Sequence, residues 1–100
     1  MKWVWTWGGT CFGYLDGMDL YTYDGRHIGR LKEEEIYGKD GLYLGEIKNE
    51  NRLITNCGKK NWRSSPFTPF GRRGAYARYA NYVGYVMYSG YEDFPLPDEI

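Results

Sequence analysis

Residues 20–35, LYTYDGRHIGRLKEEE, and residues 36–51, IYGKDGLYLGEIKNEN, decide the fold, because the second stretch repeats the pattern of the first. The preceding residues 4–19, VWTWGGTCFGYLDGMD, follow the same pattern, and a shorter fourth copy, LITNCGKKNWR, spans residues 53–63. Self-similarity at a fixed period is typical of repeat architectures, in which each copy forms one supersecondary unit. The chain is therefore a tandem repeat with a period of about 16 residues.

The unit has the composition of a β-hairpin. It opens on an aliphatic residue, which is Val4, Leu20, Ile36 or Leu53. A glycine comes five residues later in every copy, at Gly9, Gly25, Gly41 and Gly58. An apolar residue before a second glycine and a closing aliphatic residue then recur three times, as Phe12-Gly13 with Leu15, Ile28-Gly29 with Leu31, and Leu44-Gly45 with Ile47. Asp-Gly between two apolar runs favours a tight hairpin turn. We therefore expect Gly9, Gly25, Gly41 and Gly58 to be equivalent corners of successive hairpins.

Strand pairing follows from the position of the turn. Counting outward from the Asp24-Gly25 turn, Tyr21 pairs with Ile28 and Leu20 pairs with Gly29. Both faces of such a sheet are partly apolar, so we expect one face to fill a central core and the other to be covered by the tail or by a second subunit. The alternative is a β-bulge at the second glycine of each unit, which would turn the closing aliphatic residue inward.

These features predict an all-β fold of four hairpins, a closed meander of about eight strands with pseudo-fourfold symmetry. Residues 1–64 form the hairpin domain, and residues 65–100 form a connector and a tail that packs on that domain or on a neighbouring subunit. The tail places tyrosines three residues apart, at Tyr76, Tyr79, Tyr82, Tyr85, Tyr88 and Tyr91. Three is the repeat of an extended polyproline II chain, and a short helix at Ala75–Val83 is the alternative.

The repeated segments LYTYDGRHIGRL and IYGKDGLYLGEI resemble the bacterial 4-fold β-flower proteins, a family related to the 5-fold β-flower repeats. The resemblance covers residues 4–63. The tail, with its tyrosine triplets and Tyr91-Glu92-Asp93-Phe94, is similar to the period-three stretch and aromatic-acidic close of that family, but tyrosine, alanine and valine replace its prolines. The resemblance implies the fold, and it brings no catalytic residue, because no activity is established for the family.

The residues give little support to catalysis. The only histidine, His27, lies near Asp24 and Glu33–Glu35, but it occupies a repeat position that other copies fill with unrelated side chains, so we read it as a strand-surface residue. No nucleophile triad, metal-ligand spacing or phosphate loop is present. Cys11 and Cys57 are too few for a disulfide scaffold and are read as reduced, half-buried thiols. We predict no enzyme activity, no cofactor and no metal site, in a cytoplasmic protein that does not engage membranes.

The favoured functional interpretation is a non-catalytic interaction or assembly module that contacts a protein partner or another copy of itself. Formal net charge is zero, with 13 basic and 13 acidic residues, so the whole chain has no electrostatic preference for one class of partner. The binding surface is expected among the hairpin aromatics, with packing of the core or tail as the competing role of the same rings. These residues are Trp3, Trp5, Trp7, Tyr21 and Tyr37.

Two other classes of binding remain open. Residues 52–79 are basic and aromatic and contain no acidic residue, a combination that holds single-stranded nucleic acid through phosphate contacts and base stacking. The residues that would do so are Arg52, Lys59, Lys60, Trp62, Arg63, Arg72, Arg73 and Arg78. Alternatively, the hairpin aromatics stack on carbohydrate, as in cell-wall-binding repeats.

Overall fold

The computed structural model describes all of residues 1–100 and contains β-strands and two short 3-10 helices but no α-helix. The elements are β1 (Lys2–Thr6), β2 (Cys11–Asp16), β3 (Asp19–Thr22), β4 (His27–Lys32), β5 (Glu35–Tyr37), β6 (Tyr43–Lys48), β7 (Arg52–Asn56), η1 (Cys57–Lys59), β8 (Tyr91–Asp93) and η2 (Pro97–Glu99). Neither helix has the length and apolar composition needed to cross a membrane.

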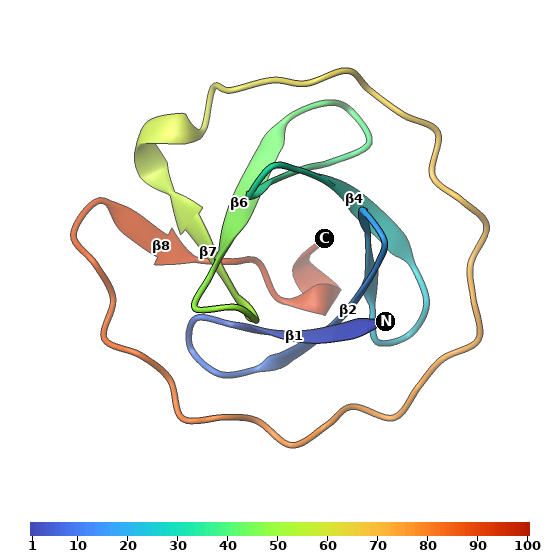
Figure 1. Cartoon of the computed structure of the whole chain (residues 1–100), viewed down its shortest axis with the longest axis horizontal. Helices are drawn as coiled ribbons and strands as arrows, with labels where there is room; N and C mark the ends of the chain where they lie inside the picture. The colour runs from blue at the N-terminus through green and yellow to red at the C-terminus, as the bar shows by residue number, and fades with distance from the viewer.

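Seven strands close into a barrel. Each strand from β1 to β7 pairs with the next one in antiparallel orientation, and β7 returns to β1 through a short parallel pairing of Trp5 with Arg52 and Thr6 with Leu53. The later half of β7 also pairs with β8, which comes from the C-terminal end of the chain (Figure 1). The all-β prediction is confirmed, and closure leaves the barrel without a free sheet edge between β1 and β7.

Three of the four predicted glycine corners are alike. Gly9, Gly25 and Gly41 follow β1, β3 and β5 and adopt φ angles of 97°, 93° and 83°, which only glycine adopts at little cost. The prediction is wrong for Gly58, which lies in η1, where its amide donates to the Asn56 side chain. Polar residues follow Gly58 in place of an apolar return strand, so β8 takes the position beside β7.

Each of the three hairpins contains a bulge. In the second hairpin Leu20 pairs with Gly29 as expected, but Tyr21 pairs with His27, so the expected pairing of Tyr21 with Ile28 is wrong. Ile28 is therefore the additional residue of the bulge. The same register shift occurs beside Phe12 in the first hairpin and beside Leu44 in the third. The structure thus adopts the bulged alternative, next to the second glycine of each unit.

The bulges allow more side chains to reach the interior. The first aliphatic residue of every unit is fully buried in the core, together with Phe12, Leu15 and Phe94. The remaining bulge residues and closing aliphatics, Ile28, Leu31, Leu44 and Ile47, pack against this cluster. Since burial of one such side chain is worth about 1.5–3 kcal/mol, this cluster supplies much of the stability of the small barrel.

Residues 64–90, here called the belt, run around the outside of the barrel without regular secondary structure (Figure 1). The alternative of a helix at Ala75–Val83 is therefore wrong. The belt is attached to the hairpin turns by backbone hydrogen bonds, since the amides of Ser64, Arg73 and Tyr82 donate to the carbonyls of Gly41, Gly25 and Gly9 at 2.8–2.9 Å.

A second set of bonds lies three residues further along the belt. The amides of Phe67, Tyr76 and Tyr85 donate at 2.8–3.1 Å to the carbonyls of Lys39, Tyr23 and Trp7, each two residues before a turn glycine. Successive attachment points are thus nine residues apart on the belt and sixteen apart on the barrel. Each nine-residue segment of the belt therefore spans one 16-residue hairpin unit of the barrel.

The C-terminal segment closes the barrel from within. The Asp93 carboxylate accepts hydrogen bonds from the amides of Trp7 and Gly8 at 2.9 and 3.0 Å. Phe94 enters the core, where its ring lies 5.2 Å from that of Phe12. A Cβ at Gly45 would lie 2.5 Å from the Phe94 ring, so glycine is required there to admit Phe94. Residues beyond 64 thus supply both a strand and a core side chain.

The substitution Gly25→Ala should weaken the attachment of the belt. A Cβ at Gly25 would lie 2.2 Å from the Arg73 carbonyl oxygen, whereas a Cβ at Gly17, which also has positive φ, meets nothing within 4 Å. Gly17→Ala therefore costs only the left-handed backbone energy, about 1 kcal/mol. Gly25→Ala should cost about 1–3 kcal/mol more in urea denaturation, because the belt must move away. Amide exchange of Arg73 and Tyr76 should accelerate only in Gly25→Ala, and equal effects of the two substitutions would contradict this account.

Candidate binding site

Four of the five hairpin aromatics expected to bind a partner are buried, and belt residues contact three of them, Trp5, Trp7 and Tyr21. Trp5, Trp7, Tyr21 and Tyr37 are buried, and Trp3 is partly exposed. The Trp7 ring lies 4.8 and 5.3 Å from the rings of Tyr85 and Tyr88. The four buried hairpin rings therefore expose too little area to form a binding surface by themselves, and their contacts are packing contacts.

The tryptophan side chains of β1 and its turn also hold the belt by hydrogen bonds. The indole N–H of Trp5 donates to the Ala80 carbonyl, and that of Trp7 donates to the Val86 carbonyl, both at 3.0 Å. A buried indole N–H needs an acceptor, and the belt has no internal ladder to satisfy its own carbonyls. These bonds therefore satisfy both partners and fix the belt over the first hairpin.

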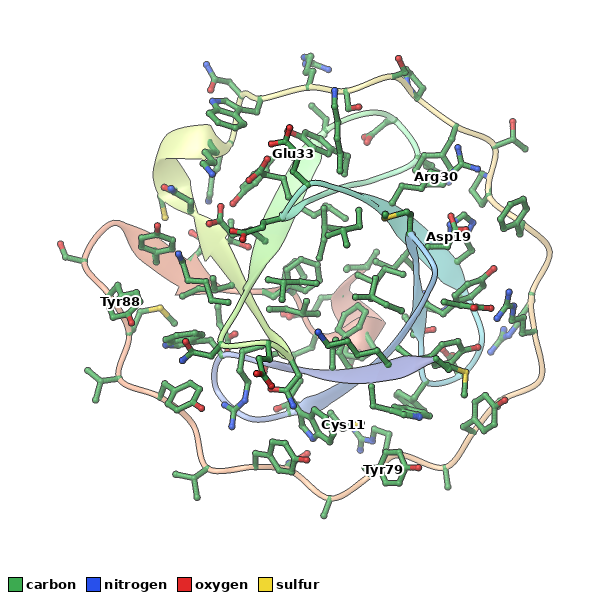
Figure 2. All side chains as sticks on the ribbon, in the orientation of Figure 1. Cys11, Asp19, Arg30, Glu33, Tyr79 and Tyr88 are labelled. Carbon is green, nitrogen blue, oxygen red and sulfur yellow. The ribbon has the colours of Figure 1, made fainter.

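One group of aromatic rings lines an open cleft. Trp3 and Trp5 from β1 line a cleft of about 400 Å³ together with Tyr79, Ala80 and Tyr82 from the belt. The Trp5 and Tyr82 rings are stacked at 4.0 Å, and the Trp3 and Tyr79 rings meet edge to face at 4.7 Å. Tyr79, labelled on the belt in Figure 2, is 55% exposed. We call this feature the aromatic cleft.

Arg52, the first of the predicted nucleic-acid-binding cations, is buried between the barrel and the belt. Its guanidinium donates to the carbonyls of Trp7 at 3.3 Å and Val83 at 2.9 Å, and lies 4.3 Å from the centre of the Tyr85 ring. No carboxylate lies within ion-pair distance, so carbonyl oxygens and aromatic faces stabilise the charge. Arg52 thus attaches the belt and is not available to a phosphate.

Most of the other basic residues in this group are paired with acids from elsewhere in the chain. The pairs are Lys59 with Glu46 and Glu35, Lys60 with Glu92, Arg72 with Asp24, and Arg73 with Asp16, at 2.8–3.4 Å. Arg78 lies over the Tyr23 ring at 5.1 Å, Trp62 is 44% exposed beneath Lys59, and Arg63 is exposed without an acidic partner. Residues 52–79 contain no acidic residue, but acidic side chains from other parts of the chain lie beside most of these cations.

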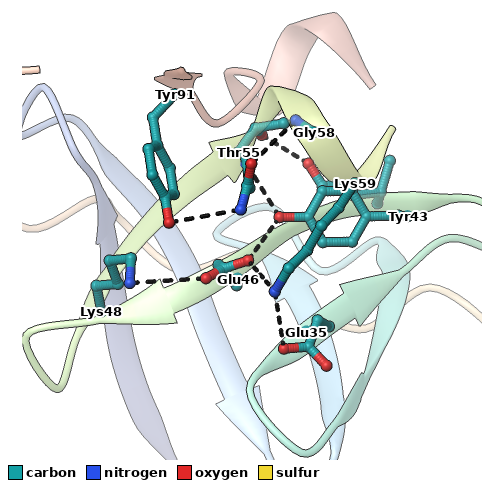
Figure 3. Close-up of polar contacts among 10 residues, drawn as sticks. Glu35, Tyr43, Glu46, Lys48, Thr55, Gly58, Lys59 and Tyr91 are labelled. Carbon is teal, nitrogen blue, oxygen red and sulfur yellow. Dashed lines mark hydrogen bonds and ion pairs between the residues drawn. The ribbon is translucent and has the colours of Figure 1, made fainter. Parts of the chain in front are cut away.

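Glu46 and Lys59 belong to a polar cluster that fixes η1 against β6 (Figure 3). Glu46 accepts from the Tyr43 hydroxyl at 2.8 Å and from Lys59 at 3.0 Å, and Tyr43 in turn accepts from the Asn56 amide at 3.0 Å. Burial raises the pKa of Tyr43 far above its usual value and keeps it a neutral donor. Burial alone would raise the pKa of Glu46, but the bonds from Lys59 and Tyr43 lower it overall. All these groups are partnered, which is the pattern of a structural network.

His27 also contacts the belt. Its Nδ1 accepts a hydrogen bond from the Phe70 amide at 2.9 Å, and its ring is stacked on Phe70 at 4.9 Å. Its Nε2 lies 2.9 Å from the Asp19 carboxylate without the geometry of a hydrogen bond. The expectation of a strand-surface residue is wrong, since the His27 side chain is fully buried.

Two further expectations concern thiols and metal ligands. Cys11 and Cys57 are both free, but Cys11 is buried and Cys57 exposed, so neither is half-buried as expected. No group of three or more His, Cys, Asp or Glu side chains lies close enough together to hold a metal ion. The aromatic cleft is the candidate site, since its lining is entirely hydrophobic and includes the exposed Tyr79 and Tyr82.

Sequence reasoning found Trp3 and Trp5 but missed the belt half of the cleft. The tyrosine spacing places Tyr79, Ala80 and Tyr82 in the tail but does not indicate which hairpin each residue contacts. The nine-residue spacing of the belt aromatics contains that information, since Phe67, Tyr76 and Tyr85 are nine apart, as are Phe70, Tyr79 and Tyr88.

Comparison with known proteins gives one family. The sequence profile of the 4-fold beta flower protein family matches residues 1–80, which is most of the chain. Searches of curated proteins and of solved structures found no match.

Acid should destabilise the fold partly through Glu46. Its pKa is lowered in the folded protein, so its contribution to stability is fully present at neutral pH and is lost as the pH falls below the usual value of 4.5. The substitution Glu46→Gln should cost about 1–3 kcal/mol at pH 7 in urea denaturation. The cost should be smaller at pH 3, because the stabilisation from a carboxyl with a lowered pKa decreases as the pH falls below 4.5. Glu34→Gln, at an exposed residue without an ion pair, is the control and should change little at either pH. A cost for Glu46→Gln that does not depend on pH would contradict the assignment.

Proposed function

Because the chain belongs to the 4-fold beta flower family, we propose that it is a non-catalytic interaction module of the β-flower type. The barrel serves as a scaffold of tandem hairpins with pseudo-fourfold symmetry, and the tyrosine-rich belt completes its outer face. The observation that carries the proposal is the aromatic cleft, an accessible site that hairpin and belt form together. Its ligand is an extended apolar segment of a partner protein.

The chemistry of the lining supports an apolar ligand. All five residues around the cleft are hydrophobic, and no charged side chain is among them. The indole N–H of Trp5 is already used by the Ala80 carbonyl, so it is not free to bind a polar ligand. Aromatic side chains with little competing polarity are what protein interfaces concentrate at their centres.

The shape of the surface supports an extended ligand. The belt has no regular secondary structure and stacks Tyr82 on the Trp5 ring, and this packing supports a ligand with a similar extended backbone. Further along the belt Val83 and Val86 are 87% and 89% exposed, so apolar surface continues beyond the cleft. An extended peptide that docks on aromatic rings through alternate side chains is a common recognition mode.

Carbohydrate is the second candidate, because exposed aromatic rings also stack on sugars. Tyr79 and Tyr82 are 55% and 46% exposed and supply such faces. A sugar also needs several hydrogen-bonding partners for its hydroxyls, and the only free polar side-chain groups among the lining residues are the tyrosine hydroxyls and the indole N–H of Trp3. Nucleic acid has less support, because Arg52 is buried and most of the neighbouring cations are paired with carboxylates.

A cytoplasmic location is part of the same proposal. It is supported by the free thiols Cys11 and Cys57, since a reducing compartment keeps such groups unpaired.

The cleft can be blocked without removing a packed side chain. Ala80 lies in the cleft and is exposed, and Ala77, three residues earlier on the belt, is exposed outside it. The experiment selects peptides from a random 12-residue display library against the wild-type protein and measures their affinity for Ala80→Arg and Ala77→Arg. Selected peptides should be apolar, and Ala80→Arg should weaken them at least about tenfold, whereas Ala77→Arg should leave them unchanged.

The same three proteins on a glycan array and with a fluorescent oligothymidylate test the other classes. Sugar binding that is lost only in Ala80→Arg would replace the protein ligand by carbohydrate. Oligonucleotide binding that falls with rising salt and is equal in all three proteins would favour nucleic acid. Peptides that bind Ala80→Arg as well as they bind the wild type would refute the cleft as the binding site.

A further inference from the structure

A second cavity lies between two neighbouring hairpins, away from the residues of the aromatic cleft. It has a volume of about 450 Å³ and is bounded by the start of β4, by the Gly38–Asp40 turn before β6, and by the belt at Pro69–Arg72. The volume is within the range that holds a small molecule. Neither the proposed function nor the packing of the belt requires this cavity.

Part of the lining is apolar. Ile28 and Leu44, the bulge residues of the second and third hairpins, face the cavity together with Phe70 of the belt. The Phe70 amide bond to His27 fixes the belt at this point, so the aromatic wall is held in place. These side chains offer contact area to a compact apolar or aromatic group.

The charged part of the lining is mainly basic. Arg26, Lys39 and Arg72 contribute three cations, against the single acidic side chain of Asp40. Asp24, outside the lining, pairs with both Arg26 and Arg72, at 3.4 and 3.0 Å. Lys39 has no carboxylate within ion-pair distance.

The cations differ in their freedom to bind a ligand. The Arg26 guanidinium already donates to the main-chain oxygens of Ile100, which also lines the cavity, at 2.7 Å, and of Pro97. Arg72 is 62% exposed and uses one side of its guanidinium for Asp24. Lys39 and Arg72 are therefore the residues with donors available to an anion, and Arg26 adds to the positive potential.

We propose that this cavity binds a small molecule that combines one anionic group, a carboxylate or a phosphate, with an apolar or aromatic body. Lys39 and Arg72 contact the anionic group, and Phe70, Ile28 and Leu44 contact the body. Charge-assisted hydrogen bonds to phosphate or carboxylate are stronger than neutral ones, and the apolar wall selects against simple ions. The site is independent of the aromatic cleft and of its ligand.

The probe for this site is phenyl phosphate, titrated into the labelled protein of residues 1–100 and followed by amide NMR shifts. We expect saturable binding in the millimolar range, with the largest shifts at Gly38, Lys39 and Phe70. Lys39→Gln and Arg72→Gln should each weaken binding about tenfold, the effect of losing one charge-assisted contact. Lys32→Gln, an exposed lysine outside the cavity, removes the same charge and should have no effect.

Three results would overturn the proposal. Equal weakening by Lys32→Gln would reduce the effect to general surface charge. Shifts confined to the indole signals of Trp3 and Trp5 would place the probe in the aromatic cleft. Inorganic phosphate or benzyl alcohol binding as tightly as phenyl phosphate would show that the cavity does not recognise the two groups together.

Discussion

A closed sheet with apolar side chains on both faces is stable only when both faces are kept from water, and this requirement governs the whole protein. The inner face is filled by the aliphatic residues of the hairpins and by Phe94. The outer face carries the rings of Trp5, Trp7 and Tyr21, and no second sheet covers them. A single extended segment covers them instead, and every feature of the surface follows from how that segment is attached.

The attachment uses backbone groups that the hairpin turns leave free. The carbonyls of Gly9, Gly25 and Gly41 point outward and accept from belt amides, while indole N–H groups and Arg52 satisfy carbonyls of the belt. Such a segment needs no internal hydrogen-bond ladder because its partners are spread over three turns. Aromatic rings of the belt then lie against hairpin rings, and the aromatic cleft opens where this packing leaves the outer surfaces of Trp3 and Tyr79 accessible.

The sequence was informative about what repeats and much less so about what the repeats contact. The turns at Gly9, Gly25 and Gly41 and the buried first aliphatics follow from local pattern, so they were predictable. The bulge was one of two options, because the local sequence is compatible with Tyr21 paired either with Ile28 or, across a bulge, with His27. Packing of the core decides between these two registers. Gly58 keeps the repeat position of a turn glycine, but the residues after it form no return strand. The repeat pattern alone therefore predicts a hairpin corner where the chain forms η1. The pairing of Lys59 with Glu46, and the burial of Arg52 and His27, depend on segments far apart in sequence, which composition does not bring together.

The spacing of the belt attachments links two lengths that lie in different parts of the chain. Each hairpin occupies sixteen residues of barrel and needs nine residues of belt to reach the next turn. An insertion at a solvent-facing strand connection changes one hairpin locally, but one extra belt residue would displace every later aromatic ring from its hairpin. By the same geometry, a barrel with one more hairpin would need nine more belt residues to cover it. The number of hairpins and the length of the belt are therefore coupled.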